Sequence, residues 1–292
     1  MRVTTRLTHA LLGLAVTTGT LATAATAATA APSDMHRDTN GPAVSSTAAY
    51  LVDAKTGEVR FSKQADTRRP VASITKAMTA YTVLQQAKPT DKVKVTAEDV
   101  RYASQGGASV AHLRAGDTLT VEDTLYALML PSGADAAHVL ARTYGPSVKT
   151  FVAEMNANAA KLGMKNTQYV NADGMPYQGG GYSTARDQVA LAKAVLDNPT
   201  LKKITSTRYH SVPSTSEHRS YAWKNTNRLL GSAGALGVKT GYTRAAGYTL
   251  AFAAERDDSL LVGVVLGAPS SGQRFQNAET LLDWAAASDA AK

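Results

Sequence analysis

Apolar and polar residues follow a strand-like pattern near both ends of the chain and a helical pattern between them. Near the N-terminal end, two short strand-like segments flank the turn-forming residues 55–58, and together they predict a hairpin. In the middle of the chain, apolar residues recur at intervals of three and four, which is typical of helices with one buried face. The predicted strands are 48–53, 59–62, 91–96, 237–243, 248–255 and 260–266, and the predicted helices are 73–86, 121–129, 134–144, 151–162, 182–196 and 274–287.

This distribution predicts an α+β fold, in which one antiparallel sheet is assembled from distant parts of the chain. Helices flank the sheet, and those between the strands form an inserted all-helical lobe. We predict one folded domain at 47–288, with a sheet lobe at about 47–95 and 205–288 and a helical lobe at about 96–204. A cleft is expected between the two lobes.

The N-terminal residues have the composition of a secretory signal peptide. Arg2 and Arg6 precede an apolar run at 10–16, and small residues follow this run. We therefore expect residues 1–31 to be a signal peptide and residues 32–46 to be a polar leader. The protein is then exported, and is extracellular or associated with the cell wall. No later stretch of the sequence is long and apolar enough to cross a membrane.

The composition excludes several classes of function. Hydrophobic residues make up 44% of the chain and charged residues 18%, and cysteine is absent, so disulfides and thiolate metal sites are excluded. The histidines are scattered and none is paired at the spacing of metal ligands. The net charge of +8 favours association with an anionic cell envelope. Basic and aromatic residues do not cluster as nucleic-acid binding requires.

The first candidate for catalysis is the pair Ser73 and Lys76 at the start of the predicted helix at 73–86. Ser73 follows an extended segment that ends in a proline, and it can cap the helix. Residues three apart share a helix face, so the Lys76 amine can lie beside the Ser73 hydroxyl and activate it. This spacing occurs by chance about once in a chain of this length. A helix cap beside a surface lysine is therefore the alternative interpretation.

Two further motifs follow along the chain. Pro131-Ser132-Gly133 separates two predicted helices, and such a break is either an ordinary turn or a means of pointing a hydroxyl into a cleft. Lys239-Thr240-Gly241 lies on a late predicted strand, where glycine lets a ligand approach the backbone closely. The same tripeptide occurs as Lys55-Thr56-Gly57 in the predicted hairpin turn. The tripeptide is therefore informative only in its setting.

In this order along the chain, the three motifs resemble the signature of the penicillin-recognising serine enzymes. The surrounding sequence is similar to the serine-type D-alanyl-D-alanine peptidases of family S11, which are low-molecular-mass penicillin-binding proteins. The resemblance extends over about 48–287 and implies a fold like that of the DD-peptidases and β-lactamases. The segments that carry it are 72–80, 128–133, 182–187, 225–230 and 239–243.

The resemblance implies a reaction on peptidoglycan stem peptides that end in D-Ala-D-Ala. Ser73 would attack the carbonyl between the two D-alanines and form an acyl-enzyme, with Lys76 as the base. Ser132 and Lys239 would pass a proton to the departing D-alanine, although which lysine takes the first proton stays open. β-Lactams would react with Ser73 as covalent inhibitors, and no metal or organic cofactor is implied.

The same resemblance assigns four residues to substrate binding. The backbone N–H groups of Ser73 and Tyr242 would stabilise the oxyanion, because such donors are fixed before the charge develops. Thr240 and Arg274 would bind the terminal carboxylate of the substrate, and Gly241 would let the substrate lie close to the strand.

Two features depart from the family pattern. Ala134 occupies a position where relatives usually have asparagine, so one hydrogen bond to Lys76 or to the substrate is missing. The sequence also stops soon after Trp284, and we therefore expect a catalytic domain without the additional β-domain and amphipathic tail of longer relatives.

Two alternative functions remain open at this point. A class A β-lactamase shares the fold and the serine but needs a glutamate that activates water, and Glu154 and Glu217 lack the sequence context of such a residue. A non-catalytic protein that binds muropeptides is the second alternative, and Ala134 is its best support. The sequence does not separate a carboxypeptidase from a transpeptidase, and it does not indicate the oligomeric state.

Overall fold

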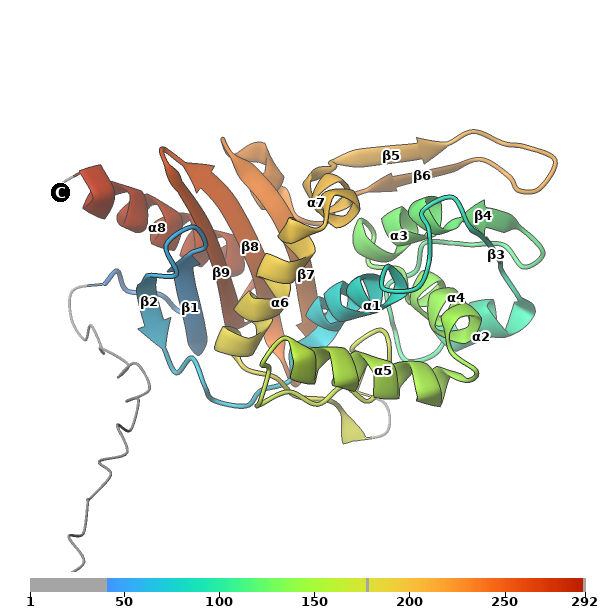
Figure 1. The fold of residues 1–292 in the computed structure, drawn as a ribbon, viewed down its shortest axis with the longest axis horizontal. Coiled ribbons are helices and arrows are strands. Elements are labelled where there is room, and N and C mark those ends of the chain that lie inside the picture. The colour runs from blue at the N-terminus through green and yellow to red at the C-terminus, as the bar shows by residue number, and fades with distance from the viewer. Residues whose placement is uncertain (1–40, 177–178, 291–292) are drawn as a thin grey trace, which may run out of the picture. The chain divides into compact units, whose positions relative to one another are not determined.

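The computed structural model describes residues 41–176 and 179–290. The predicted signal peptide at 1–31 and residues 32–40 of the predicted polar leader lie outside the described residues. The described part has the α+β fold that the sequence predicts, and none of its helices is long and apolar enough to cross a membrane. Its main sheet is antiparallel and contains, in spatial order, β2 (Val59–Lys63), β1 (Ala48–Asp53), β9 (Ser259–Ala268), β8 (Gly247–Arg256) and β7 (Ala235–Thr243) (Figure 1).

Segments from the two ends of the described chain meet in this sheet, as the strand pattern predicts. β1 pairs with β9 along its whole length, while β7, β8 and β9 follow one another as neighbouring antiparallel strands. Every residue of β1 is buried, because the strand lies inside the sheet and both faces are covered. The hairpin predicted at 48–62 and the three late strands are therefore confirmed.

Helices cover both faces of the main sheet (Figure 1). α8 (Ser271–Ala290) packs across β8 and β9 on one face, where Leu281 joins Phe252 in a buried apolar cluster. α6 (Ala185–Asp197) packs against β1 and β9 and belongs to a second, larger cluster. Removal of these apolar side chains from water is the main contribution to the stability of such a fold.

A helical region lies beside β7, one of the two edge strands of the main sheet (Figure 1). Its helices are α1 (Thr75–Val83), α2 (Ala97–Ala103), α3 (Val121–Met129), α4 (Ala134–Tyr144), α5 (Val148–Lys161) and α7 (Pro199–Ser206). α1 is the buried centre of this region, because α3, α4, α5 and α6 all contact it. α1 begins later and ends earlier than the helix predicted at 73–86, so that helix is shorter than expected at both ends.

Two small antiparallel sheets of two strands each lie apart from the main sheet. β3 (Lys92–Lys94) pairs with β4 (Thr118–Thr120), and β5 (Tyr209–Val212) pairs with β6 (Tyr221–Lys224). β3 contacts α3 and α4, so the strand predicted at 91–96 lies beside the helical region and not in the main sheet. The boundary between the two predicted lobes stays a prediction.

The hydrophobic pattern does not predict α2, α7 or the β5–β6 hairpin. α2 and α7 are only 7 and 8 residues long, too short for a clear period. Their start signals are nevertheless present, since Thr96 and Asp99 form a capping box before α2 and Asn198 caps α7. The β5–β6 hairpin depends on tertiary contacts, such as the stacking of His210 on Tyr126 at 3.7 Å between ring centroids.

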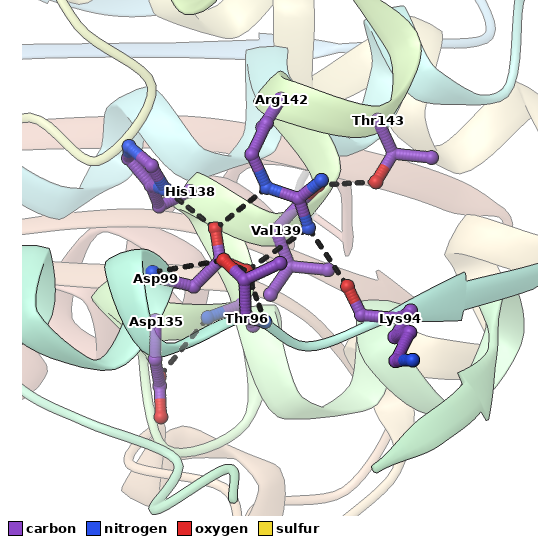
Figure 2. A network of polar contacts seen from close by, with 9 residues as sticks. Lys94, Thr96, Asp99, Asp135, His138, Val139, Arg142 and Thr143 are labelled. Carbon is purple, nitrogen blue, oxygen red and sulfur yellow. Dashed lines mark hydrogen bonds and ion pairs between the residues drawn. The ribbon is translucent and has the colours of Figure 1, made fainter. Parts of the chain in front are cut away.

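A buried charge network joins α2 to α4 (Figure 2). The Asp99 carboxylate accepts hydrogen bonds of 3.0 and 3.1 Å from Arg142 and lies 2.6 Å from Nδ1 of His138. Burial raises the pKa of Asp99, but the hydrogen bonds from His138 and Arg142 outweigh it and hold that pKa well below its usual range. The network holds α4 against α2. Because α4 begins two residues after Ser132, it also helps to fix the position of this candidate site residue.

Candidate active site

Ser73 lies in a short 3-10 helix, η1 (Ala72–Ile74), directly before α1. Neither η1 nor α1 has a side-chain cap, so the prediction that Ser73 caps the helix is wrong. Its Oγ instead accepts a hydrogen bond of 3.0 Å from Nζ of Lys76. The contact expected from the spacing of three residues is therefore present, although the first residue lies in a tighter turn than expected.

The backbone that carries Ser73 is held in an uncommon conformation. Ala72 has a φ of 53°, in the left-handed region that non-glycine residues rarely occupy. Gly174, with a φ of 79°, packs directly against it, and a Cβ at residue 174 would lie 2.0 Å from the carbonyl oxygen of Ala72. The turn before Ser73 therefore depends on a glycine from a distant segment.

Gly174→Ala is expected to lower the free energy of unfolding by about 2–4 kcal/mol, because it combines positive-φ strain with a clash against the Ala72 backbone. Gly163→Ala is the matched control, since Gly163 has a φ of 74° but no atom within 4 Å of its missing Cβ. Urea unfolding of both variants measures the difference. Equal losses in the two variants would show that the contact with Ala72 contributes nothing.

Lys76 is buried, with only 1% of its surface exposed. Its Nζ donates a second hydrogen bond, of 2.7 Å, to the carbonyl oxygen of Asp173. Burial lowers the pKa of Lys76 to about 8, although the carboxylates of Asp173 and Asp135 act in the opposite direction. A lysine in this environment can lose its proton near neutral pH and act as a base toward Ser73.

Ser132 lies in the break between α3 and α4, with a φ of 67°. Its side chain is buried at the wall of a cavity that also contains Ser73, and its Oγ has no hydrogen-bond partner among the described residues. The neighbouring Asp135 carboxylate accepts hydrogen bonds of 2.9 Å from the N–H groups of Ala111 and Leu113. The break therefore presents a hydroxyl to the cavity while Asp135 ties an adjacent segment to α4.

Lys239 extends from β7 and is 1% exposed. Its Nζ donates a hydrogen bond of 3.0 Å to the carbonyl oxygen of Thr240. Burial lowers the pKa of Lys239 well below its usual value, and the charges of Lys76 and Arg274 lower it further. The second Lys-Thr-Gly sequence, which begins at Lys55, lies at the exposed hairpin turn as predicted.

A cavity of about 420 Å³ lies where a cleft is predicted, between β7 and the helical region. Six of the eight predicted site residues line it: Ser73, Ser132, Thr240, Gly241, Tyr242 and Arg274. The other two, Lys76 and Lys239, are buried, and Lys76 is hydrogen-bonded to the cavity residue Ser73. The structure thus brings together residues that are widely separated in the sequence.

Residues of β7 form one wall of this cavity. The Thr240 hydroxyl shares a hydrogen bond of 2.7 Å with the hydroxyl of Thr226. Gly241 leaves no room for a side chain, because a Cβ there would lie 3.0 Å from the backbone nitrogen of Ser73. Tyr242 is 52% exposed and stacks on Tyr248, with ring centroids 4.3 Å apart. The backbone of β7 therefore lies against the turn that carries the nucleophile.

Arg274 is the last of the predicted site residues along the chain, and it is almost fully buried. α8 begins at Ser271 rather than at the predicted residue 274, so Arg274 lies within its first turn. The guanidinium donates a hydrogen bond of 2.9 Å to the carbonyl oxygen of Gly241. Burial, aided by the charge of Arg228, lowers the pKa of Arg274 to about 10, so the side chain stays charged at neutral pH. Such a cation can bind a carboxylate.

Three residues that contact the predicted site are missed by sequence reasoning. Thr226 bonds to Thr240, and it lies within the segment 225–230 that carries the resemblance. Asp135 and Asp173 both influence Lys76. Asp135 had a signal in its position beside Ser132 and Gly133, whereas Asp173 had none, because it reaches Lys76 from 97 residues away.

Ala134, Glu154 and Glu217 bear on the two alternative functions, and all three lie outside the lining of the cavity that contains Ser73. Ala134 is fully buried at the start of α4, and its backbone N–H donates to the carbonyl oxygen of Ser109 at 2.8 Å. Glu154 accepts a hydrogen bond from Gln86 on the surface. Glu217 lies between β5 and β6 and pairs with a surface lysine. Neither glutamate lines the cavity that contains Ser73.

The site is that of an active-site serine enzyme, because a serine hydroxyl is hydrogen-bonded to a buried lysine at a cavity. The antiparallel sheet with a helical region beside it is the fold of the DD-peptidases and β-lactamases. The model of the D-alanyl-D-alanine carboxypeptidase family, peptidase family S11, matches residues 35–270. The chain belongs to this family and is a serine D-alanyl-D-alanine carboxypeptidase or transpeptidase, as the resemblance predicts.

Known relatives agree with this assignment. The chain is 38% identical over 256 residues to a D-alanyl-D-alanine carboxypeptidase of Streptomyces sp. (strain K15), which covers 83% of this chain and 88% of that protein. It is 33% identical over 253 residues to the D-alanyl-D-alanine carboxypeptidase DacF of Bacillus subtilis (strain 168), covering 85% of this chain but only 64% of the relative. The crystal structure of the Streptomyces K15 DD-transpeptidase superposes with a TM-score of 0.82 at 36% identity, over 85% of this chain and 100% of that one. These relatives support the peptidase and not the β-lactamase or the non-catalytic alternative.

Proposed function

We propose that the protein cleaves the bond between the two terminal D-alanines of peptidoglycan stem peptides, with Ser73 as the nucleophile. The observation that carries this assignment is the 3.0 Å hydrogen bond from Nζ of Lys76 to Oγ of Ser73. Lys76, once neutral, takes the Ser73 proton as Oγ attacks the carbonyl carbon. The carbon–nitrogen bond then breaks, and the acyl group stays on Ser73 while D-alanine departs.

The departing amine needs a proton, and two residues supply a route for it. The Ser132 hydroxyl at the cavity wall has no partner in the part of the chain that the structure describes, and Lys239 is buried with a lowered pKa. The N–H groups of Ser73 and Tyr242 stabilise the oxyanion, since Ser73 lies against the β7 backbone. Thr240 and Arg274, which line the same cavity, bind the terminal carboxylate of the substrate.

The acyl-enzyme is resolved either by water, which makes the protein a carboxypeptidase, or by an amine of a neighbouring stem peptide, which makes it a transpeptidase. The relatives from Streptomyces K15 carry both descriptions. The deciding experiment measures D-alanine release from a peptide that ends in D-Ala-D-Ala, with and without an added amine acceptor. Release together with a long-lived benzylpenicillin adduct supports the proposal. Rapid turnover of benzylpenicillin would instead indicate a β-lactamase, and neither release nor adduct would indicate a binding protein.

We also propose that residues 1–31 direct export and that the mature protein associates with the anionic cell wall. The proposal is supported by the basic, apolar and small residues that follow one another in this segment. The net charge is +8 for the full chain and stays at +6 when Arg2 and Arg6 are removed with this segment. Binding of the mature protein to purified walls is expected to weaken as salt is added, because salt screens exposed charges. Binding that does not respond to salt would contradict an electrostatic association.

A further inference from the structure

Asp173 has a buried carboxylate whose hydrogen bonding is incomplete. The residue has no exposed surface. Its Oδ1 accepts a hydrogen bond of 3.0 Å from the N–H of Met175, but its Oδ2 has no partner among the described residues. A buried carboxylate oxygen without a partner is costly, so its presence calls for a physical explanation.

The segment around Asp173, which we call the 171–175 loop, contains internal hydrogen bonds and is hydrogen-bonded to α1. Within the loop, the Asn171 side chain accepts a hydrogen bond of 2.8 Å from the N–H of Gly174 and donates one of 2.7 Å to the carbonyl of Met175. Two side chains of α1 donate to successive carbonyl groups of the loop. Lys76 bonds to Asp173 at 2.7 Å and Thr79 bonds to Ala172 at 2.6 Å.

The charged groups that face Lys76 come from three elements. Asp173 approaches from the 171–175 loop, Asp135 from α4 and Lys239 from β7. The Asp135 carboxylate already accepts hydrogen bonds from three backbone N–H groups. Asp173, in contrast, has an oxygen that bonds to nothing in the described part of the chain. Its negative charge is therefore less neutralised by hydrogen bonds than that of Asp135.

We propose that Asp173 is a positioning residue for Lys76: its carbonyl holds the Lys76 amine against Ser73, and its carboxylate adds a buried negative charge in the same residue that bonds this amine. This inference rests on the proposed role of Lys76 as the base. It accounts for a buried carboxylate in a loop that also packs against the turn that carries Ser73.

The electrostatics of the two lysines agree with this assignment. Burial lowers the pKa of both. Asp173, followed by Asp135, raises the pKa of Lys76 again, whereas Lys76 and Arg274 lower the pKa of Lys239 further. Removal of the Asp173 charge should therefore make Lys76 easier to deprotonate.

Asp173→Asn tests the proposal, because it keeps the side-chain shape and the backbone carbonyl but removes the charge. The rate of Ser73 acylation by benzylpenicillin is measured against pH. A base works only when neutral, so a lower Lys76 pKa moves the acid limb of the profile to lower pH, by about one unit. Asp173→Glu keeps the charge, and its limb should stay close to that of the parent. Asp187→Asn is the control for loss of a buried carboxylate, since Asp187 accepts hydrogen bonds of 2.8 Å from Asn166 and Thr167 and is not a partner of Lys76.

An acylated parent with an unmoved limb in Asp173→Asn would overturn this inference alone. A variant that acylates like the parent but hydrolyses the acyl-enzyme more slowly would also overturn it, because Asp173 would then assist the attack of water and not the acylation step. No acylation of the parent would overturn the proposed function and this inference with it. A second measurement uses only the parent chain: an NMR titration of the lysine side chains should give Lys76 the higher pKa of the two buried lysines, and the reverse order would also overturn the inference.

Discussion

Replacement of Ser73 by alanine is expected to abolish the covalent adduct with benzylpenicillin and to lower D-alanine release by about a thousandfold or more. The effect is this large because Ser73 forms the bond that the rest of the site only assists. The variant should still fold, since the side chain contributes one hydrogen bond, to Lys76. Intact mass after incubation with benzylpenicillin measures the adduct directly.

Ser109→Ala is the matched control for this experiment. Ser109 lines the same cavity, and the contact that it makes with Ala134 uses its backbone carbonyl, which the substitution keeps. The control should form the adduct at close to the parental rate. An adduct that persists in Ser73→Ala would move the nucleophile to another residue and contradict the assignment of the site.

Replacement of Lys76 by arginine is expected to slow acylation by about 10²–10⁴-fold, which is the usual contribution of a general base. Arginine keeps the positive charge and the donor groups but does not lose its proton in proteins. In the parent, Lys76 has a pKa of about 8 and is the base only when neutral. Acylation should therefore rise about tenfold per pH unit below pH 8 and level off above it. Stopped-flow acylation across pH measures both effects.

Lys202→Arg controls for the exchange itself, because Lys202 lies on the surface, 3.6 Å from Glu255, and should leave the rate unchanged. If acylation by Lys76→Arg kept the parental rate, Lys76 would not be the base. An acid limb in the parent well below pH 8 would instead favour Lys239, whose pKa is lowered further by neighbouring cations.

Local sequence was sufficient for most of the main elements and for placing Lys76 beside Ser73. The hairpin at 48–62 and the late strands follow from alternation and turn residues, and α4 has the bounds that the pattern predicts. Lys76 was predicted beside Ser73 from a spacing of three residues, which brings side chains together in any helix-like turn. The 3-10 turn at Ser73 was not predicted, because it depends on the packing of Gly174 against Ala72.

The family resemblance supplied what spacing alone left open. By itself, Ser-x-x-Lys favours a helix cap beside a surface lysine over a catalytic pair, because this spacing occurs by chance about once in a chain of this length. The order of three motifs along the chain pointed to one family, and the match over residues 35–270 confirms that assignment. The same resemblance does not identify Asp173, because this residue reaches Lys76 from 97 residues away along the chain.

The sequence by itself determined which residue types are available, where most strands and helices form, and which family the chain belongs to. Periodicity and the order of motifs can be read along the chain without knowledge of its folding. Only the tertiary structure decided that Lys76 and Lys239 are both buried, that Ser132 lines the cavity and has no partner within 41–176 and 179–290, and that the 171–175 loop holds Lys76. These features set the chemistry of the site through desolvation and charge. They arise from contacts between segments about a hundred residues apart, whose relative placement depends on the packing of the whole domain and not on any local pattern.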